Sequence, residues 1–108
     1  MAGEPGSRGN GEAFRIELRE EDTGGVFQVF ADGQDAPAGE MTFSKTGDHL
    51  WIIDHTGVRP PLQGTGAAAA LVRRGVEEAR KRGIRIYPLC PYARSQFQRH
   101  PEYQDVMQ

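Results

Sequence analysis

Apolar and polar residues alternate along most of the first half of the chain. Between residues 14 and 20, apolar side chains are separated by charged ones, which predicts a half-buried strand. The same pattern, punctuated by glycine turns, predicts three more strands over residues 26–31, 38–45 and 49–58. Because the connections between them are short, we expect the four strands to form an antiparallel meander.

The periodicity changes from two to about 3.6 after Pro60-Pro61. From residue 65 to 82, small and branched apolar residues recur at spacings of three and four, which predicts an amphipathic helix. We expect Glu77, Glu78 and the basic run 80–82 on its solvent face, with ion pairs from Glu77 to Lys81 and from Glu78 to Arg82. Gly83 is placed to be the left-handed residue that ends the helix.

The last quarter of the chain predicts one more strand and a short helix. Residues 84–89 read as a fifth strand, and a crossover through the preceding helix would set it parallel to the fourth. Pro88 argues for a strand end or an edge. A short helix over residues 93–99 and a terminal segment over 103–107 complete the pattern, leaving little chain to cover the outer edge of the fifth strand.

Composition narrows the class of protein. The 108 residues suffice for one domain, which we place at residues 13–108 behind a flexible tail, residues 1–12, rich in glycine. With thirteen basic and fifteen acidic side chains, the chain lacks the excess of positive charge that is typical of nucleic-acid-binding proteins. The single cysteine, Cys90, and three scattered histidines offer neither a disulfide nor metal-ligand spacing. Without an apolar run of membrane-spanning length or a signal peptide, we expect a cytoplasmic protein and no membrane partner.

A loop of small residues opens directly into the predicted helix. Gln63, Gly64, Thr65 and Gly66 place unpaired backbone N–H groups beside the positive end of a helix dipole, and such a turn binds anions. The bland alternative is a tight strand-to-helix turn with no ligand. Glycine at positions 64 and 66 favours the anion site, because a side chain there would keep a phosphate from the backbone.

Two other phosphate-binding motifs fit less well. Residues 64–69 match the dinucleotide pattern G-x-G-x-x-A, but four strands precede the turn and the next strand carries no acidic residue, so a Rossmann domain is excluded. A Walker loop is excluded because no Gly-Lys-Ser/Thr occurs.

Four ordered segments of the chain resemble the GNAT acetyltransferase superfamily, in particular its minimal single-domain YjdJ-like branch. The pyrophosphate loop of that superfamily, [Arg/Gln]-x-x-Gly-x-[Gly/Ala], is matched by Gln63, Gly66 and Ala68. The other segments are His55-Thr56-Gly57-Val58, Pro88-Leu89-Cys90-Pro91-Tyr92 and His100-Pro101-Glu102-Tyr103. The branch commonly has an acidic residue in place of Gly57 and an arginine in place of Gln63, which puts any substrate contact from that acid in doubt.

The resemblance implies an α+β fold with a GNAT-like mixed sheet and acetyl-coenzyme A as acyl donor. In that fold the fourth and fifth strands splay apart and the acyl-pantetheine inserts between them. Backbone groups of Thr56 and Val58 would pair with the pantetheine amides. The pyrophosphate would lie on the loop and first helical turn, formed by Gln63, Gly64, Thr65, Gly66, Ala67 and Ala68.

Three residues are candidates for acid–base or covalent chemistry. We expect His55 to share a strand face with Trp51 and Ile53, where burial would keep it neutral and able to act as general base; the alternative is a core histidine. Cys90 could be a nucleophile, a general acid or a small buried residue. Tyr92 is a rival general acid, with core packing as its bland alternative.

Acetyl transfer to an amine, either a small amine or a protein or peptide lysine, is therefore the leading hypothesis. The alternative is a non-catalytic module that binds coenzyme A, and a third possibility is a fragment that pairs with another subunit through the edge of the fifth strand. We expect no metal and a monomer or weak dimer. The acceptor does not follow from the sequence.

Overall fold

The computed structural model describes residues 14–108, and the predicted tail over residues 1–12 lies outside them. The described part contains the predicted succession of four strands, a long helix, a fifth strand and a shorter helix. In chain order the elements are β1 (Phe14–Glu21), β2 (Gly24–Ala31), β3 (Gly39–Thr46), β4 (Leu50–Val58), the 3-10 turn η2 (Pro60–Leu62), α1 (Ala67–Arg82), β5 (Arg85–Pro88), α2 (Pro91–Arg99) and the 3-10 segment η3 (Pro101–Val106).

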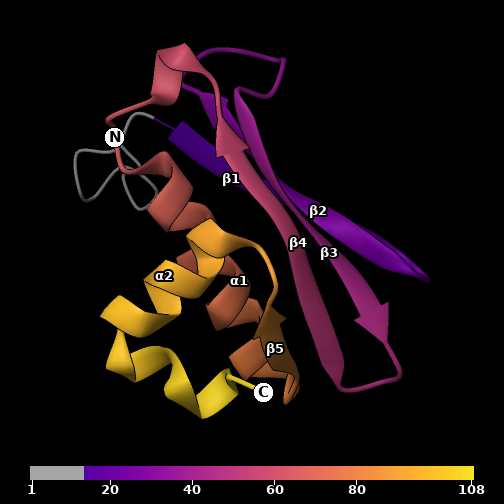
Figure 1. Ribbon diagram of the computed structural model, residues 1–108. Helices are drawn as coiled ribbons and strands as arrows, with labels where there is room; N and C mark the ends of the chain where they lie inside the picture. The colour runs from indigo at the N-terminus through magenta and orange to yellow at the C-terminus, as the bar shows by residue number, and fades with distance from the viewer. Residues whose placement is uncertain (1–13) are drawn as a thin grey trace.

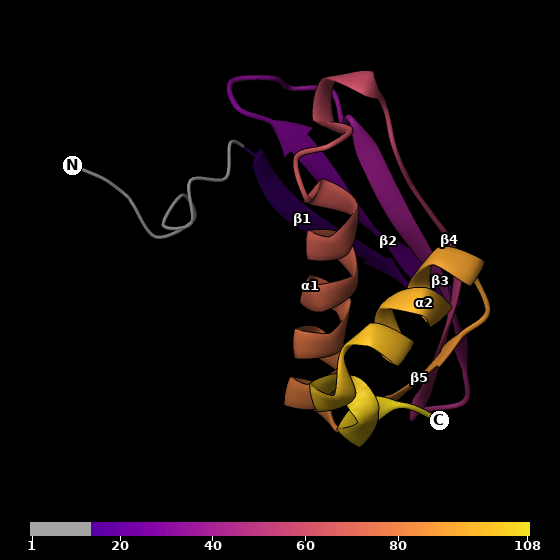
Figure 2. The same cartoon turned by 60° about the vertical axis from the view of Figure 1, so that its left-hand side comes forward.

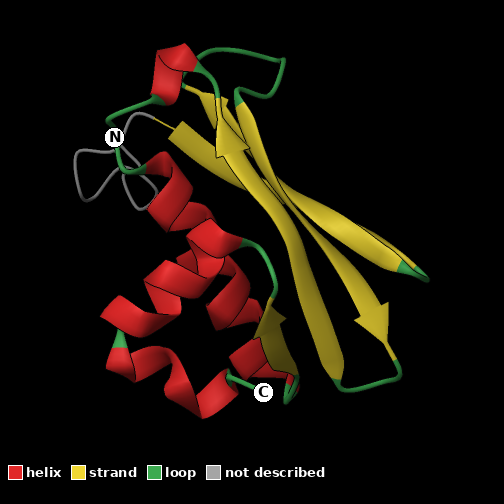
Figure 3. Ribbon diagram, in the orientation of Figure 1, coloured by secondary structure: helices red, strands yellow, loops and turns green. Residues whose placement is uncertain are grey.

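The five strands form one mixed sheet in the order β1-β2-β3-β4-β5. The first four pair as an antiparallel meander, and β5 pairs parallel to β4 after the crossover through α1, as the sequence predicts. The helices lie on one face of the sheet and leave the other face uncovered (Figure 1 and Figure 3). We call the uncovered side the outer face.

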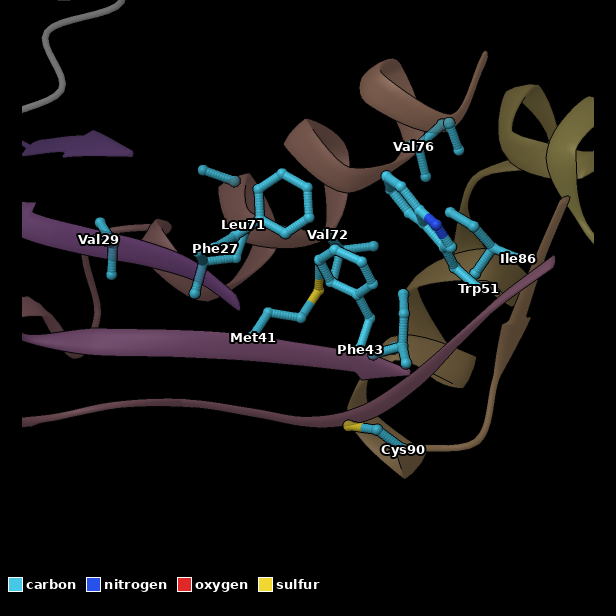
Figure 4. Packing of buried hydrophobic residues seen from close by; sticks show 14 of the residues in the cluster. Phe27, Val29, Met41, Phe43, Trp51, Leu71, Val72, Val76, Ile86 and Cys90 are labelled. Carbon is cyan, nitrogen blue, oxygen red and sulfur yellow. The ribbon is translucent and has the colours of Figure 1, made fainter. Parts of the chain in front are cut away.

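The core lies between α1 and the covered face of the sheet. Phe27, Phe43 and Trp51 form an aromatic cluster against the helix (Figure 4), with the Phe43 and Trp51 rings stacked at 4.3 Å between centroids. Phe27 is fully buried and Trp51 is 3% exposed, so both belong to the core. Small residues on α1 let it pack closely: a Cβ at Gly75 would come within 2.7 Å of the Met41 side chain.

Glycine and proline residues determine where the two α-helices begin and where α1 ends. α1 begins at Ala67 rather than residue 65, because Gly66 has a left-handed φ of 87° that cannot continue a helix. It ends, as predicted, at Gly83, whose φ is 71° and whose N–H bonds to carbonyls of the last turn. α2 begins at Pro91, two residues earlier than predicted, since proline is well tolerated in a first helical turn.

The prediction that Glu78 faces solvent is wrong. Its side chain is 7% exposed and accepts hydrogen bonds from Arg74 and Arg82, each at 2.7 Å. Arg82 also donates to Glu20 of β1, so these charges close the gap between the end of α1 and the sheet. The predicted i,i+4 pair from Glu78 to Arg82 is confirmed. The predicted pair from Glu77 to Lys81 is not among the ion pairs of residues 14–108, where Lys81 pairs with Glu78 at 3.7 Å.

The outer edge of β5 is covered, contrary to the prediction. Met107 forms a parallel bridge with Ile86, the Gln108 N–H donates to the Ile86 carbonyl at 2.8 Å, and Arg85 donates to the Met107 carbonyl. Figure 2 shows the C-terminal segment running back beside β5. None of the helices in residues 14–108 is long and apolar enough to cross a membrane.

Candidate functional site

A bulge divides β4 into two unlike halves. Phe43 of β3 pairs with Ile53, but the next pair is Thr42 with His55, so Asp54 is an extra residue in β4. Residues after the bulge change faces: Thr56 lies opposite the buried Met41, and His55 turns to the outer face, where it is exposed. The expectation that His55 shares a buried face with Trp51 and Ile53 is therefore wrong, because strict alternation does not hold across a bulge.

The second half of β4 has no neighbour on its β5 side. β5 pairs with β4 only from Leu50 to Ile53, and the Cys90 N–H then donates to the Ile53 carbonyl at 3.0 Å. From there the chain turns away into α2, and Figure 1 shows β5 beside only the lower part of β4. Residues 54–58 are left as an open edge, the arrangement expected where two strands splay apart.

Register determines which backbone groups of β4 face that open edge. The Arg59 N–H donates to the Ala38 carbonyl at 2.7 Å, which makes the neighbouring pair, Gly39 with Val58, a non-hydrogen-bonded one. Val58 and, two residues earlier, Thr56 therefore direct their backbone N–H and C=O groups away from β3. These are the two residues whose backbone the sequence analysis selected.

The glycine loop connects this edge to the start of α1. Gly64 and Gly66 have φ angles of 79° and 87°, and a Cβ at either would meet nothing within 4 Å, so the backbone there is open to a ligand. The Ala67 N–H donates to the Thr65 hydroxyl at 3.3 Å. Within the described residues, the N–H groups of Gly66, Ala68 and Ala69 have no acceptor, and they lie at the positive end of the α1 dipole.

Gln63 ties the loop to β4. Its side-chain Nε2 donates to the Val58 carbonyl at 3.2 Å, and its backbone N–H donates to the Pro60 carbonyl. The Thr65 hydroxyl donates to the Leu62 carbonyl at 2.5 Å and holds the next corner. The open edge and the loop therefore form one continuous end of the molecule, which we call the open end (residues 54–69).

The open end holds several polar groups that have no partner within the described residues. It offers backbone donors along β4, an accessible loop, and one polar atom that the fold leaves without a bond: Thr56 Oγ1 is buried and has no hydrogen-bond partner within residues 14–108. A buried hydroxyl without a partner is costly, and a bound amide or carbonyl would satisfy it.

Cys90 lies at the junction where β5 leaves β4. Its side chain is 5% exposed and belongs to the hydrophobic core, and its backbone caps the start of α2, with the Arg94 N–H donating to its carbonyl. Among the described residues no hydrogen bond joins it to His55, which lies on the other face of β4. The structure thus brings Cys90 beside the bulge but does not bring the two side chains together.

Tyr92 lies two residues further, in the first turn of α2, and packs partly buried against the core. Burial raises the pKa of its hydroxyl above the ordinary tyrosine value; the Arg99 guanidinium opposes the rise and the Cys90 thiol adds to it. The hydroxyl therefore stays protonated throughout the neutral range.

A small hollow on the outer face accompanies His55. It encloses about 180 Å³ and is lined by Glu40, His55, Gly57, Val58 and Arg59. The His55 ring leans toward Gly57, where a Cβ would come within 3.3 Å of its Nε2. Sequence reasoning missed Glu40, because only the register of β3 against β4 places it across from Gly57, and it missed Arg59, which carries no motif. No cluster of potential metal ligands is present in residues 14–108.

Comparison with known proteins agrees with this geometry. The family described as GCN5-related N-acetyl-transferase matches residues 26–106. The solution structure of a GCN5-like protein from Staphylococcus aureus is 28% identical to this chain, with a TM-score of 0.64, and the match covers 85% of this chain and 87% of that one.

Two more distant structures share the fold. A Bacillus subtilis acetyltransferase solved in complex with coenzyme A is 24% identical over 80% of this chain and 74% of its own, with a TM-score of 0.57. A ribosomal-protein-alanine N-acetyltransferase from Brucella melitensis biovar Abortus 2308 is 20% identical over 73% of this chain and 62% of its own, with a TM-score of 0.60. Among curated proteins, none matches.

The family match spans most of the chain, and its range includes β4, the glycine loop, α1 and β5. The finer assignment to the YjdJ-like branch stays a prediction. The chain belongs to the GCN5-related N-acetyltransferase family, a family of acetyltransferases whose acyl donor is acetyl-coenzyme A.

Proposed function

We propose that this protein transfers the acetyl group of acetyl-coenzyme A to the nitrogen of a primary amine. One observation carries the proposal: the unpaired edge of β4 and the unpaired N–H groups at the start of α1 belong to the same end of the molecule. A ligand with two amides at one end and a pyrophosphate at the other matches both sets of donors. Acetyl-coenzyme A supplies the acetyl group as a thioester.

Backbone groups do most of the cofactor binding in this proposal. The N–H groups of Thr56 and Val58 bond to the pantetheine arm, and the Thr56 hydroxyl takes a partner there. The pyrophosphate lies against the loop and first helical turn formed by residues 63–68, where the N–H groups of Gly66 and Ala68 have no acceptor within the described residues. Hydrogen bonds to a charged phosphate are stronger than neutral ones, so the loop should contribute the larger share of affinity.

His55 removes the proton from the attacking amine. Its ring is exposed on the outer face, one residue before the backbone donor of Thr56, so an amine can reach it from solvent. An amine must lose its proton before its nitrogen can attack a carbonyl carbon, and histidine is the side chain best suited to that task near neutral pH.

Tyr92 returns a proton to the sulfur that leaves. Because its pKa is raised by burial, its hydroxyl is a donor over the whole physiological range. Deprotonation of the Tyr92 hydroxyl is therefore expected to lower activity only above about pH 10, the ordinary pKa of tyrosine.

Cys90 offers a second route. Its sulfur would give up its proton, bond to the acetyl carbon and release the coenzyme A thiol, and the amine would then take the acetyl group and restore the Cys90 thiol. The near-complete burial of Cys90 favours a packing role over this covalent one.

Release of free coenzyme A thiol from acetyl-coenzyme A, in the presence of a panel of amines, tests the proposal. His55→Gln should lower kcat by about 10²-fold or more, the usual effect of losing a general base. His49→Gln is the matched control: His49 is an exposed histidine just before β4, far along the strand from the bulge. Equal activity of both variants would remove His55 from the mechanism.

Two more variants separate the routes through Tyr92 and Cys90. Tyr92→Phe should lower kcat, whereas Tyr87→Phe, at an exposed tyrosine of β5, should not. Intact-protein mass spectrometry after incubation with acetyl-coenzyme A detects an acetylated Cys90, and its loss in Cys90→Ala would establish the covalent route. Full activity of Cys90→Ala would exclude it.

Thermal shift tests cofactor binding apart from turnover. Coenzyme A should stabilise the wild type and not Gly66→Glu, whose carboxylate would occupy the phosphate position. Stabilisation without thiol release for any amine would favour the non-catalytic binding module. No stabilisation of the wild type would contradict the proposal altogether.

A further inference from the structure

The outer-face hollow beside His55 is built from two strands. Glu40 of β3 lies directly across from Gly57 of β4, and Arg59 closes one side just after β4 ends. Its volume of about 180 Å³ equals the space of about six water molecules at about 30 Å³ each. A Cβ at residue 57 would come within 3.3 Å of the His55 Nε2, so the glycine leaves room beside the ring.

The ionic groups of this hollow lack partners, unlike those elsewhere on the outer face. On β1, Arg15 pairs with Glu17 and Arg19 donates to Gln28 of β2. Within residues 14–108, the carboxylate of Glu40 and the guanidinium of Arg59 make no ion pair or side-chain hydrogen bond. A carboxylate, an imidazole and a guanidinium around one small hollow, each without a partner, leave their bonding capacity for a ligand.

The hollow lies next to the site of acyl transfer. The side of β4 that carries His55 and Gly57 forms its floor, while Thr56, the residue between them, directs its backbone N–H to the open edge. An amine in the hollow would therefore stand one residue from the backbone groups assigned to the acyl donor, with His55 between solvent and the reacting nitrogen.

We propose that this hollow is the acceptor subsite and that it selects a small primary amine with a carboxylate close to the nitrogen, as in a free amino acid. Glu40 binds the ammonium group, and Arg59 binds the carboxylate. The inference rests on the proposed function and assigns substrate-binding roles to two residues outside the cofactor site. A second positive charge on the acceptor would meet Arg59, so diamines are disfavoured.

Steady-state kinetics with three matched amines test the selection: glycine, glycinamide and ethylenediamine. For the wild type, kcat/KM should be highest for glycine and lowest for ethylenediamine. Glu40→Gln should raise KM about tenfold for all three, the effect of losing one charge-assisted hydrogen bond, with kcat changed far less. Glu17→Gln removes a carboxylate from the same sheet face outside the hollow and should change neither constant.

Arg59→Gln separates the two ends of the acceptor. It should reduce the preference for glycine over glycinamide about tenfold and leave KM for glycinamide within twofold of the wild type. Coenzyme A should stabilise both variants in thermal shift as it does the wild type. Unchanged KM values in both variants, with turnover and coenzyme A binding retained, would overturn the acceptor assignment and leave the proposed function intact.

Direct binding keeps the inference testable if no amine is turned over. Glycine titrated into the protein saturated with coenzyme A should shift the backbone amide resonances of Glu40, Gly57 and Arg59, and Glu40→Gln should raise the glycine concentration needed for half of each shift about tenfold. Absence of shifts in the folded wild type would refute the subsite whatever the activity assays show.

Discussion

The two ends of α1 differ in how completely their polar groups are bonded. At the closed end, which we define by Glu20, Lys45, Glu78, Arg82 and Gly83, each charge has an ion-pair partner and the helix is capped. At the open end, several N–H groups, the Thr56 hydroxyl and the Arg59 guanidinium have none within residues 14–108. Both ends are built from the same helix, α1, and the same sheet.

The difference shows how one fold separates stability from binding. Groups at the closed end satisfy one another, so they stabilise the folded chain and have nothing to offer a ligand. Groups at the open end reduce the stability of the free protein, because buried or clustered polar groups without partners are costly. Binding of a ligand would recover that free energy.

The largest effect is expected in the core beside the closed end. Trp51→Ala removes a side chain that is 3% exposed, stacks on Phe43 and lies under the Arg82 guanidinium. It should lower the free energy of unfolding by about 3–5 kcal/mol, as measured by urea denaturation. Leu89→Ala, at an apolar residue that is 51% exposed, should cost less than about 0.5 kcal/mol. Comparable losses would contradict the packing described here.

A smaller effect is expected from pH at the closed end. Hydrogen bonds from Arg82 and Lys45 lower the pKa of Glu20 from 4.5 to about 2. Its ion pairs should therefore stabilise the fold fully above about pH 5.5, and this stability should be lost as pH falls toward 2. The shift sets an upper limit of about 3 kcal/mol, which solvent screening at this partly exposed site reduces to about 1–2 kcal/mol.

Urea denaturation of the wild type and Glu20→Gln at pH 7 and pH 3 measures this contribution. The stability difference between the two proteins should be largest at pH 7 and should shrink at pH 3. Glu21→Gln, at the exposed neighbouring residue, controls for the general titration of carboxylates. A difference that is the same at both pH values would show that the Glu20 pairs do not stabilise the fold.

The smallest effect has the opposite sign and belongs to the open end. Thr56→Val replaces a buried hydroxyl that has no partner with a methyl group of similar size. The free protein should become more stable, by about 1 kcal/mol, while acetyl-coenzyme A should bind more weakly. Thr42→Val, on the outer face of β3, should change neither quantity appreciably. A destabilised Thr56→Val would mean that the hydroxyl has a partner in the free protein.

The sequence predicted the sheet well because its signals there are local. Alternation and glycine turns mark the four strands, and Gly83 marks the end of α1 by its φ of 71°. The face of His55 was predicted wrongly because a bulge is a property of two paired strands: Asp54 becomes the extra residue only when β3 is aligned with β4. The register between two paired strands cannot be predicted from the sequence of either strand alone.

The predictions that Glu78 faces solvent and that the outer edge of β5 is uncovered were wrong for a related reason. Glu78 occupies a helical position that periodicity assigns to solvent, but Arg82 and Arg74 make its burial possible by neutralising it. Met107 reaches β5 through a 3-10 segment that carries no strand pattern. Glu40 and Arg59 were missed because they carry no motif and meet His55 only in the folded sheet.

A matched pair of glycine substitutions tests the central claim, that the open end binds coenzyme A, most directly. Gly66 and Gly83 flank α1 with φ angles of 87° and 71°, and a Cβ at either meets nothing within 4 Å. Gly66→Ala and Gly83→Ala should therefore each lower the free energy of unfolding by about 1 kcal/mol. By calorimetry, Gly66→Ala should weaken coenzyme A binding about tenfold and Gly83→Ala should leave Kd unchanged. Equal Kd values for the two variants, or no binding by the wild type, would contradict the account.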